Sequence, residues 1–169
     1  TGKVFHLAMG TKRFWDVYKP YKDAPVSFGD HGTYFDYGVL KPGEEFKVQE
    51  TADSVISQLL EMGADRKTTL VGVGGGVITD MTGYIASIYM RGIRFGFVPT
   101  TLLAMVDASI GGKNGIDVGL YKNMVGVIRQ QAFILHDMIF LNTLPQSEWE
   151  NGFAEIIKHA CIKDAAMFK

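Results

Sequence analysis

Hydrophobic residues in the middle of the chain switch between helical spacing and short uninterrupted runs. Over residues 48–62 the apolar side chains recur on one helical face and Gly63 follows as a stop, which predicts an amphipathic helix. Residues 69–73 form a short apolar run that is typical of a buried parallel strand and ends in three glycines. Helical spacing returns over residues 77–90. The pattern therefore predicts a helix, a strand, a glycine turn and a second helix, in that order.

Further elements follow in the same alternating order. Residues 95–99 are typical of a strand closed by proline, and Thr100 and Thr101 can cap a short helix that ends at Ala108. Residues 133–135 predict one more buried strand, and residues 147–150 match a capping box ahead of a C-terminal helix. Because strands alternate with helices, we expect a Rossmann-like α/β fold with a mostly parallel sheet and flanking helices.

The two ends of the chain differ from its middle. Residues 4–9 and 33–39 are possible strands in an otherwise weakly patterned N-terminal segment. Near Leu144 and Pro145 the pattern changes to one long helical stretch. We therefore expect an α/β domain over residues 1–144 and the beginning of an all-helical, metal-binding domain over residues 145–169.

Composition narrows the classes of function. The 169 residues are 47% hydrophobic and carry a formal net charge of −1, so no overall basic field favours nucleic acid. The single cysteine, Cys161, excludes an intrachain disulfide framework. There is neither an apolar run long enough to span a membrane nor a secretion signal. We therefore expect a cytoplasmic protein that binds a small molecule.

The strongest local signal for chemistry is the segment Gly74 to Asp80, which joins the predicted strand to the predicted helix. Glycines let a diphosphate approach the main chain, and the free N–H groups of a helix start favour its charge. The alternative is a tight turn that needs positive φ, and the glycines alone do not decide between the two. Neither a GxGxxG fingerprint nor the lysine of a Walker loop is present.

Two further clusters carry polar chemistry. Lys113, Asn114, Lys122 and Asn123 lie near glycines and can bind an anion through charge-assisted hydrogen bonds, although the lysines could also be solvated loop charges. In the C-terminal helix, Glu155 and His159 are one turn apart and can share a metal, but two ligands do not make a site. From spacing alone a surface ion pair is the simpler interpretation of Glu155 and His159. His6, His31 and His136 have no partner at a recognisable spacing.

Seven motifs occur together in one order: GGGVITD (74–80), YMRG (89–92), VPTTLLAMVD (98–107), IGGKNGID (110–117), KN (122–123), LNTLP (141–145) and NGFAEIIK (151–158). In order and spacing they resemble 3-dehydroquinate synthase, over about residue 42 to the C-terminus. The resemblance implies the ring-closing reaction that converts 3-deoxy-D-arabino-heptulosonate 7-phosphate to 3-dehydroquinate and phosphate in the shikimate pathway. It also implies catalytic NAD, a divalent metal such as zinc or cobalt, and a homodimer.

The resemblance assigns roles residue by residue. It matches Asp107 to a carboxylate beside the reacting ring, and Lys113, Asn123 and Lys158 to contacts with the substrate. Arg91 resembles an arginine that reaches the neighbouring site across the dimer interface. Glu155 matches one of three metal ligands, the other two being histidines farther downstream. The positions matched to NAD binding are Gly43, Glu44, Lys47, Gly75, Gly76, Val77, Ile78, Thr79, Asp80, Thr100, Thr101, Lys113, Lys122, Phe140, Leu141, Asn142 and Thr143.

The chain also departs from the family. Members are considerably longer, so we expect this chain alone to be inactive, and its N-terminal segment lacks the usual first strand with an acidic turn. Within the superfamily the alternative is a cyclase that makes an inosose or a valiolone, although such relatives usually lose the pattern at 111–117. From other classes, a non-catalytic nucleotide-binding module and an iron-type alcohol or glycerol dehydrogenase also remain open.

Overall fold

The computed structural model describes residues 4–5, 40, 43–163 and 166. Of the two possible N-terminal strands, only Val4–Phe5 falls within these residues, where it forms strand β1. The rest of residues 4–9, all of 33–39, and the histidines at 6 and 31 lie outside them.

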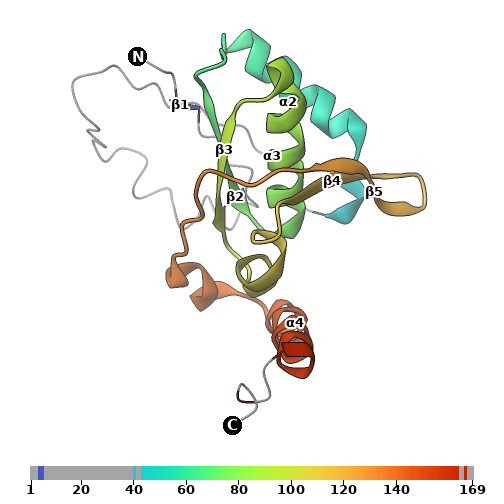
Figure 1. Cartoon of the computed structure of the whole chain (residues 1–169), viewed down its shortest axis with the longest axis vertical. Coiled ribbons are helices and arrows are strands. Elements are labelled where there is room, and N and C mark those ends of the chain that lie inside the picture. Colours follow the sequence, from blue (N-terminus) through green and yellow to red (C-terminus); the bar gives the residue numbers. More distant parts are fainter. Residues whose placement is uncertain (1–3, 6–39, 41–42, 164–165, 167–169) are drawn as a thin grey trace, which may run out of the picture.

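A parallel sheet and two helices form the body of the molecule (Figure 1). Strand β2 (Thr69–Gly74) pairs with β1 on one side and with β3 (Arg94–Pro99) on the other, and Leu70 lies opposite Phe95. Helix α2 (Gln49–Glu61) and helix α3 (Gly76–Ile88) lie on one side of this sheet. The predicted order of helix, strand, glycine turn and helix is therefore confirmed, and so is the α/β fold.

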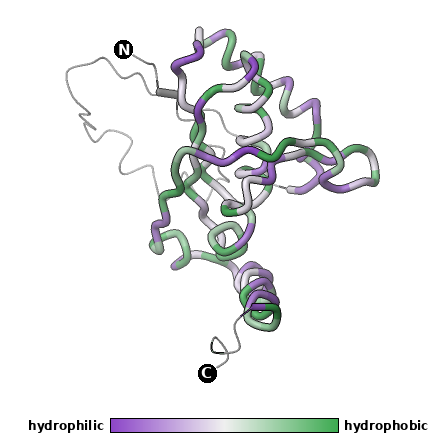
Figure 2. The backbone as a smooth tube through the Cα atoms, viewed as in Figure 1, coloured by the Kyte–Doolittle hydropathy of each residue, from purple (hydrophilic) through white to green (hydrophobic). Residues whose placement is uncertain are grey.

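One hydrophobic core joins these elements. It contains Leu59 of α2, Leu70 of β2, Ile85 of α3 and both Phe95 and Phe97 of β3, all at most 1% exposed. Colouring by hydropathy shows the sheet strands as mainly hydrophobic, whereas α2 alternates between hydrophobic and hydrophilic positions (Figure 2). This difference follows from position, because the strands are covered on both faces and α2 on only one.

An antiparallel hairpin covers the outer side of α3, and the sequence did not predict it. Strand β4 (Lys113–Val118) pairs with β5 (Tyr121–Ile128), and Gly119 makes the turn with φ +59°. Gly111 and Gly112 lie in the turn before this hairpin, whereas Lys113, Asn114, Lys122 and Asn123 lie on its strands. The hairpin escaped prediction because β4 is rich in asparagine, glycine and aspartate, which are uncommon in strands.

Two smaller expectations meet different outcomes. The short helix after Thr101 is confirmed as the π-helix η4 (Ala104–Ala108), and the Thr101 hydroxyl accepts a hydrogen bond of 3.2 Å from the Ala104 N–H. The prediction of a buried strand at 133–135 is wrong. Only one bridge joins Ile134 to Phe97, and Phe133 and Leu135 are 40% and 59% exposed.

The C-terminal helix is confirmed, but its expected cap is wrong. Helix α4 (Gln146–Lys163) follows the 3₁₀ turn η5 (Met138–Thr143) and begins directly after Pro145, so Ser147 lies inside its first turn. The Glu148 N–H donates to the Pro145 carbonyl at 3.0 Å, a bond available without any side-chain cap. The change in pattern at Leu144 thus coincides with an element boundary, whereas the division into two domains stays a prediction.

None of the helices in the described part of the chain is both long enough and apolar enough to cross a bilayer.

Helix α3 and strand β4 approach each other closely at Gly83. A Cβ at this position would collide with the side chain of Asn114, whose amide donates to the carbonyls of Gly112 at 2.8 Å and Arg129 at 2.9 Å. Because these two bonds hold the amide, it cannot move aside. We predict that Gly83→Ala lowers the free energy of unfolding by about 2 kcal/mol in urea titrations, despite alanine's better helix propensity.

Gly111→Ala is the matched control, because nothing lies within 4 Å of its Cβ position. It should change stability by less than about 0.5 kcal/mol. Equal effects of the two substitutions would contradict the close packing of hairpin on helix.

Candidate functional site

The glycine turn between β2 and α3 provides space, not an unusual backbone conformation. Gly75 precedes the first residue of α3 with φ −78° and ψ −170°, and none of the three glycines from 74 to 76 has positive φ. A Cβ on Gly75 would lie 3.2 Å from the Thr101 side chain, and one on Gly76 would lie 3.4 Å from Ala108. Of the two interpretations left open by the sequence, the requirement for positive φ is therefore excluded.

These glycines form one wall of a cleft of about 930 Å³, a size usual for cofactor sites. The first turn of α3 opens into the cleft without a side-chain cap, so helical geometry leaves main-chain N–H groups facing it. Phe140 and Thr143 of η5 lie on its other side. The expected cofactor residues that line this cleft are Gly43, Glu44, Lys47, Gly75, Gly76, Val77, Ile78, Asp80, Thr100, Thr101, Phe140 and Thr143.

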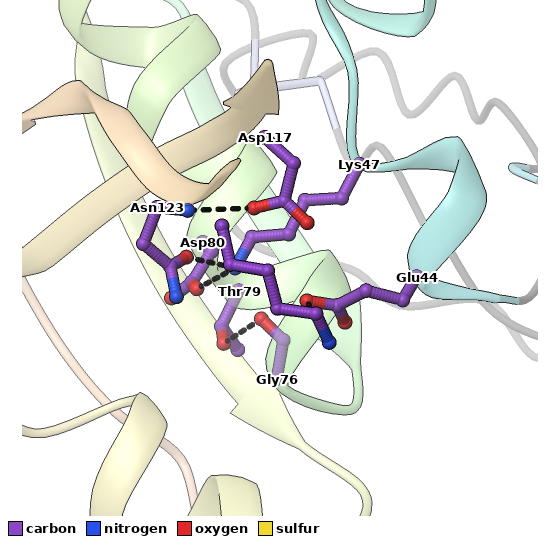
Figure 3. A network of polar contacts seen from close by, with 8 residues as sticks. Glu44, Lys47, Gly76, Thr79, Asp80, Asp117 and Asn123 are labelled. Atoms are coloured by element: carbon purple, nitrogen blue, oxygen red, sulfur yellow. Dashed lines mark hydrogen bonds and ion pairs between the residues drawn. The ribbon is translucent and has the colours of Figure 1, made fainter. Parts of the chain in front are cut away.

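A buried lysine joins three segments beside this cleft (Figure 3). The side chain of Lys47 is 4% exposed, and its Nζ lies 2.5 Å from Asp80 Oδ2 and 2.5 Å from Asn123 Oδ1. Asn123 donates its main-chain N–H to Asp117 Oδ1 at 2.7 Å, and the Asp117 N–H donates to the Lys47 carbonyl at 2.7 Å. The segment before α2, the start of α3 and the hairpin are thereby tied together.

The Asp80 carboxyl is strongly affected by this environment. Burial raises its pKa above the usual value, while the hydrogen bond and charge of Lys47 act in the opposite direction. The nearby carboxylates of Glu44 and Asp107 raise the pKa further. The direction of the shift means that the cost of burying this charge exceeds the gain from its ion pair.

A second cleft of about 720 Å³ adjoins the first, and Asp80, Asp107 and Ala108 line both. Lys113 and Asn123 of the hairpin line the second cleft together with His159 of α4. The glycine-walled cleft and the cleft lined by Lys113 and Asn123 are therefore adjacent.

Three possible metal ligands meet where α4 lies against η4. One ligand atom from each of Asp107, Glu155 and His159 lies within 4.8 Å of the other two. His159 Nε2 is 3.8 Å from Asp107 Oδ1, and Glu155 forms an ion pair with Lys158, which raises the Lys158 pKa. The expected ion pair between Glu155 and His159 is therefore replaced by two different pairs. Carboxylate and imidazole donors at this spacing suit a divalent metal.

Several expected site residues lie outside both clefts in the described part of the chain. Thr79 is buried and donates its hydroxyl to the Gly76 carbonyl at 2.9 Å, so it stabilises the first turn of α3. Lys122 is exposed, and its Nζ lies 3.8 Å from Glu44 Oε1. Arg91 lies on an exposed turn with φ +65°. The remaining ones are Leu141, Asn142 and Lys158.

Sequence reasoning missed other residues that line the first cleft, among them Glu148 and Asn151 of α4. A signal was available, because Asn151 lies four residues before Glu155 and so on the same helical face.

Comparisons with known proteins agree with this geometry. Residues 38–151 match the family model described as 3-dehydroquinate synthase N-terminal. The pentafunctional AROM polypeptide of Candida glabrata is 50% identical over 131 residues, and that of Eremothecium gossypii is 49% identical over 130 residues. These alignments cover 78% and 77% of this chain but only 8% of each AROM polypeptide.

Solved structures include close matches in fold. ValA, a 2-epi-5-epi-valiolone synthase from Streptomyces hygroscopicus subsp. jinggangensis with NAD⁺ and Zn²⁺ bound, superposes with a TM-score of 0.85 and 33% identity. The match covers 96% of this chain and 44% of ValA. A 2-deoxy-scyllo-inosose synthase complexed with carbaglucose-6-phosphate, NAD⁺ and Co²⁺ gives a TM-score of 0.80 at 23% identity, over 94% of this chain and 42% of that one.

The raised pKa of Asp80 generates a prediction about stability and pH. The folded state holds the Asp80 proton more tightly than the unfolded state does. Protonation of Asp80 therefore stabilises the fold fully below pH 3.8, the ordinary pKa of this carboxyl, and this stabilisation is lost as pH rises through the raised pKa of the folded state. Asp80→Asn removes this titration but keeps an oxygen that accepts from Lys47. We expect it to cost about 1 kcal/mol at pH 7, well below the roughly 3 kcal/mol for breaking a fully buried pair.

The difference in the free energy of unfolding between wild type and Asp80→Asn should narrow as pH rises from about 3 to 7. Urea titrations across that range measure it. A difference that widens with pH would mean that the ion pair, not burial, dominates at Asp80.

Proposed function

Because the chain belongs to the 3-dehydroquinate synthase family, we propose that it forms the nucleotide-binding part of an enzyme that converts 3-deoxy-D-arabino-heptulosonate 7-phosphate to 3-dehydroquinate and phosphate. The observation that carries the proposal is the pair of adjoining clefts, one walled by glycines at a helix start and one lined by Lys113 and Asn123. The chain spans only 8% of the length of the curated relatives it matches. The activity and the substrate of the whole protein are therefore proposed here.

NAD is the dinucleotide that we propose for the first cleft. The family resemblance supports it, and so does ValA, which is solved with NAD⁺ at 33% identity. The N–H groups at the start of α3 would bind the diphosphate, because no Cβ on Gly75 or Gly76 keeps it away. Glu44 and Asp80 line the same cleft and would accept hydrogen bonds from ribose hydroxyls. When bound, NAD supplies reversible acceptance of a hydride from the substrate.

The substrate would lie in the second cleft, beside the border with the first. Lys113 offers an ammonium and Asn123 an amide for its anionic and hydroxyl groups, and both line this cleft. Glu155 would hold a divalent metal, zinc or cobalt, together with ligands from the remainder of the protein. A bound metal polarises a substrate oxygen. Lys158, held by Glu155, keeps a protonated ammonium at the edge of this site.

The proposal also covers the domain boundaries, the cellular location and the oligomeric state. We infer an NAD-binding domain over residues 1–144, followed by the beginning of a helical domain over 145–169 that supplies Glu155. We also infer a cytoplasmic homodimer in which Arg91 serves the neighbouring site. Two observations support the role of Arg91: it lies outside both clefts of its own chain, and it is exposed on a turn with positive φ at three consecutive residues from 90 to 92.

The second candidate is another sugar-phosphate cyclase. The similarity to ValA favours it, because a valiolone synthase shares the fold over 96% of this chain. The motif at 111–117 favours dehydroquinate synthase instead, since it brings Lys113 into the second cleft.

An assay of the full-length protein tests the reaction. We predict that it releases inorganic phosphate from 3-deoxy-D-arabino-heptulosonate 7-phosphate with catalytic NAD and without net accumulation of NADH. Absence of phosphate release would reject this substrate and favour the other cyclases. Net NADH formed from a simple alcohol would instead identify a dehydrogenase, and a protein without stoichiometric metal would identify a non-catalytic module.

Substitution of the glycine wall tests the cofactor site. Gly75→Leu places a side chain in the first cleft, beside Thr101, and we expect it to weaken NAD binding more than tenfold, or about 1.4 kcal/mol, in calorimetry. Gly111→Leu is the matched control in the second cleft, and it should leave NAD affinity unchanged. Unchanged affinity in Gly75→Leu, with a native circular dichroism spectrum, would refute the assignment of the cleft.

A further inference from the structure

We propose that Lys47 is a positioning residue that holds Asn123 in place and thereby couples the two clefts. The inference rests on the proposed function, because it concerns how substrate and cofactor sites communicate. It differs from the role that the family resemblance suggested for Lys47, which was contact with NAD.

The ammonium of Lys47 is committed to protein partners. The residue is 3% exposed, and two of the three ammonium donors are accounted for by Asp80 and Asn123, each at 2.5 Å. A ligand in the first cleft therefore meets Lys47 mainly through Asp80, whose side chain is 20% exposed. We therefore expect Lys47 to link Asp80 to Asn123 instead of binding the ligand directly.

Lys47 fixes both the side chain and the main chain of Asn123. Its Nζ contacts the Asn123 amide oxygen, while its carbonyl accepts from Asp117, whose carboxylate accepts the Asn123 N–H (Figure 3). Asn123 has φ +55°, a conformation that residues with a side chain adopt rarely. Such a backbone persists where its surroundings hold it, and here Lys47 and Asp117 provide the contacts.

The position of Asp80 makes the arrangement a link between sites. Asp80 lines both clefts, whereas Lys47 lines the first and Asn123 the second. A hydroxyl that donates to Asp80 from the first cleft orders the carboxylate, and with it Lys47 and Asn123. An Asn123 amide that is ordered beforehand loses less entropy when it binds substrate. NAD should therefore raise substrate affinity, and by reciprocity the substrate should raise NAD affinity.

The first experiment needs no ligand. Hydrogen exchange of the Asn123 main-chain amide is compared between wild type and Lys47→Met. We expect at least a tenfold acceleration because Asn123 loses the Nζ contact that holds its side chain, although the carbonyl of residue 47 that accepts from Asp117 remains. Lys122→Met is the control: it removes a lysine adjacent to Asn123 that is 71% exposed and should leave the exchange unchanged. Equal exchange in wild type and Lys47→Met would overturn the inference, whatever reaction the protein catalyses.

The second experiment measures coupling in the full-length protein. Calorimetry gives the affinity for 3-deoxy-D-arabino-heptulosonate 7-phosphate with and without NAD, and we expect a factor of about ten in wild type. In Lys47→Met this factor should fall to about one, and Lys47→Arg should restore part of it. Asn123→Ala, which keeps the pair of Lys47 with Asp80, should abolish coupling too, so the test survives if Lys47→Met fails to fold.

The outcomes separate the possible roles. Loss of NAD affinity in Lys47→Met with the coupling factor retained would make Lys47 a cofactor contact and overturn the inference. Lys67→Met, which removes an exposed lysine in the turn before β2, controls for loss of charge and should retain wild-type coupling. If wild type binds neither ligand, the proposed function fails, while the exchange experiment still decides whether Lys47 holds Asn123.

Discussion

A buried ammonium has to be neutralised by the protein around it, and in this chain that requirement organises the site. Lys47 precedes α2, Asp80 lies near the start of α3, and Asn123 lies on the hairpin. Leaving such a charge unpaired in the interior is costly, so these three segments pack at one point. The two clefts meet there because the lysine brings their walls together.

Close approach of the main chain is the second condition on which the site depends. Gly75 and Gly76 bring the start of α3 next to Thr101 and Ala108, and Gly83 lets the hairpin reach the same helix. A side chain at Gly83 would collide with Asn114 and push the hairpin away from α3, whereas side chains at Gly75 and Gly76 would take up space in the first cleft. These glycines therefore matter because they lack a side chain, and not because they adopt the turn conformations with which glycine is usually associated.

Sequence periodicity was sufficient for α2, β2, α3 and β3, because each lies in one environment along its length and so has a continuous pattern. The hairpin could not be predicted: the buried residues of β4, from Asn114 to Ile116, include an asparagine and a glycine, and Asn114 fits only because Gly83 of α3 has no side chain. Motifs located most of the first cleft. They could not bring Asp107 beside Glu155 and His159, because that proximity arises only when α4 packs against η4, where the side chain of Leu102 meets the Gly152 position.

Charge is unevenly paired along the border between the clefts. Asp80 has Lys47 and Glu155 has Lys158, whereas among the described residues Asp107 has as its ion-pair partner only His159, at 3.8 Å and 47% exposed. A carboxylate with so little compensation favours the arrival of a cation. An oxidised nicotinamide ring and a divalent metal both carry positive charge. The weakly compensated charge of Asp107 thus favours positively charged ligands at a position that lines both clefts and contacts α4.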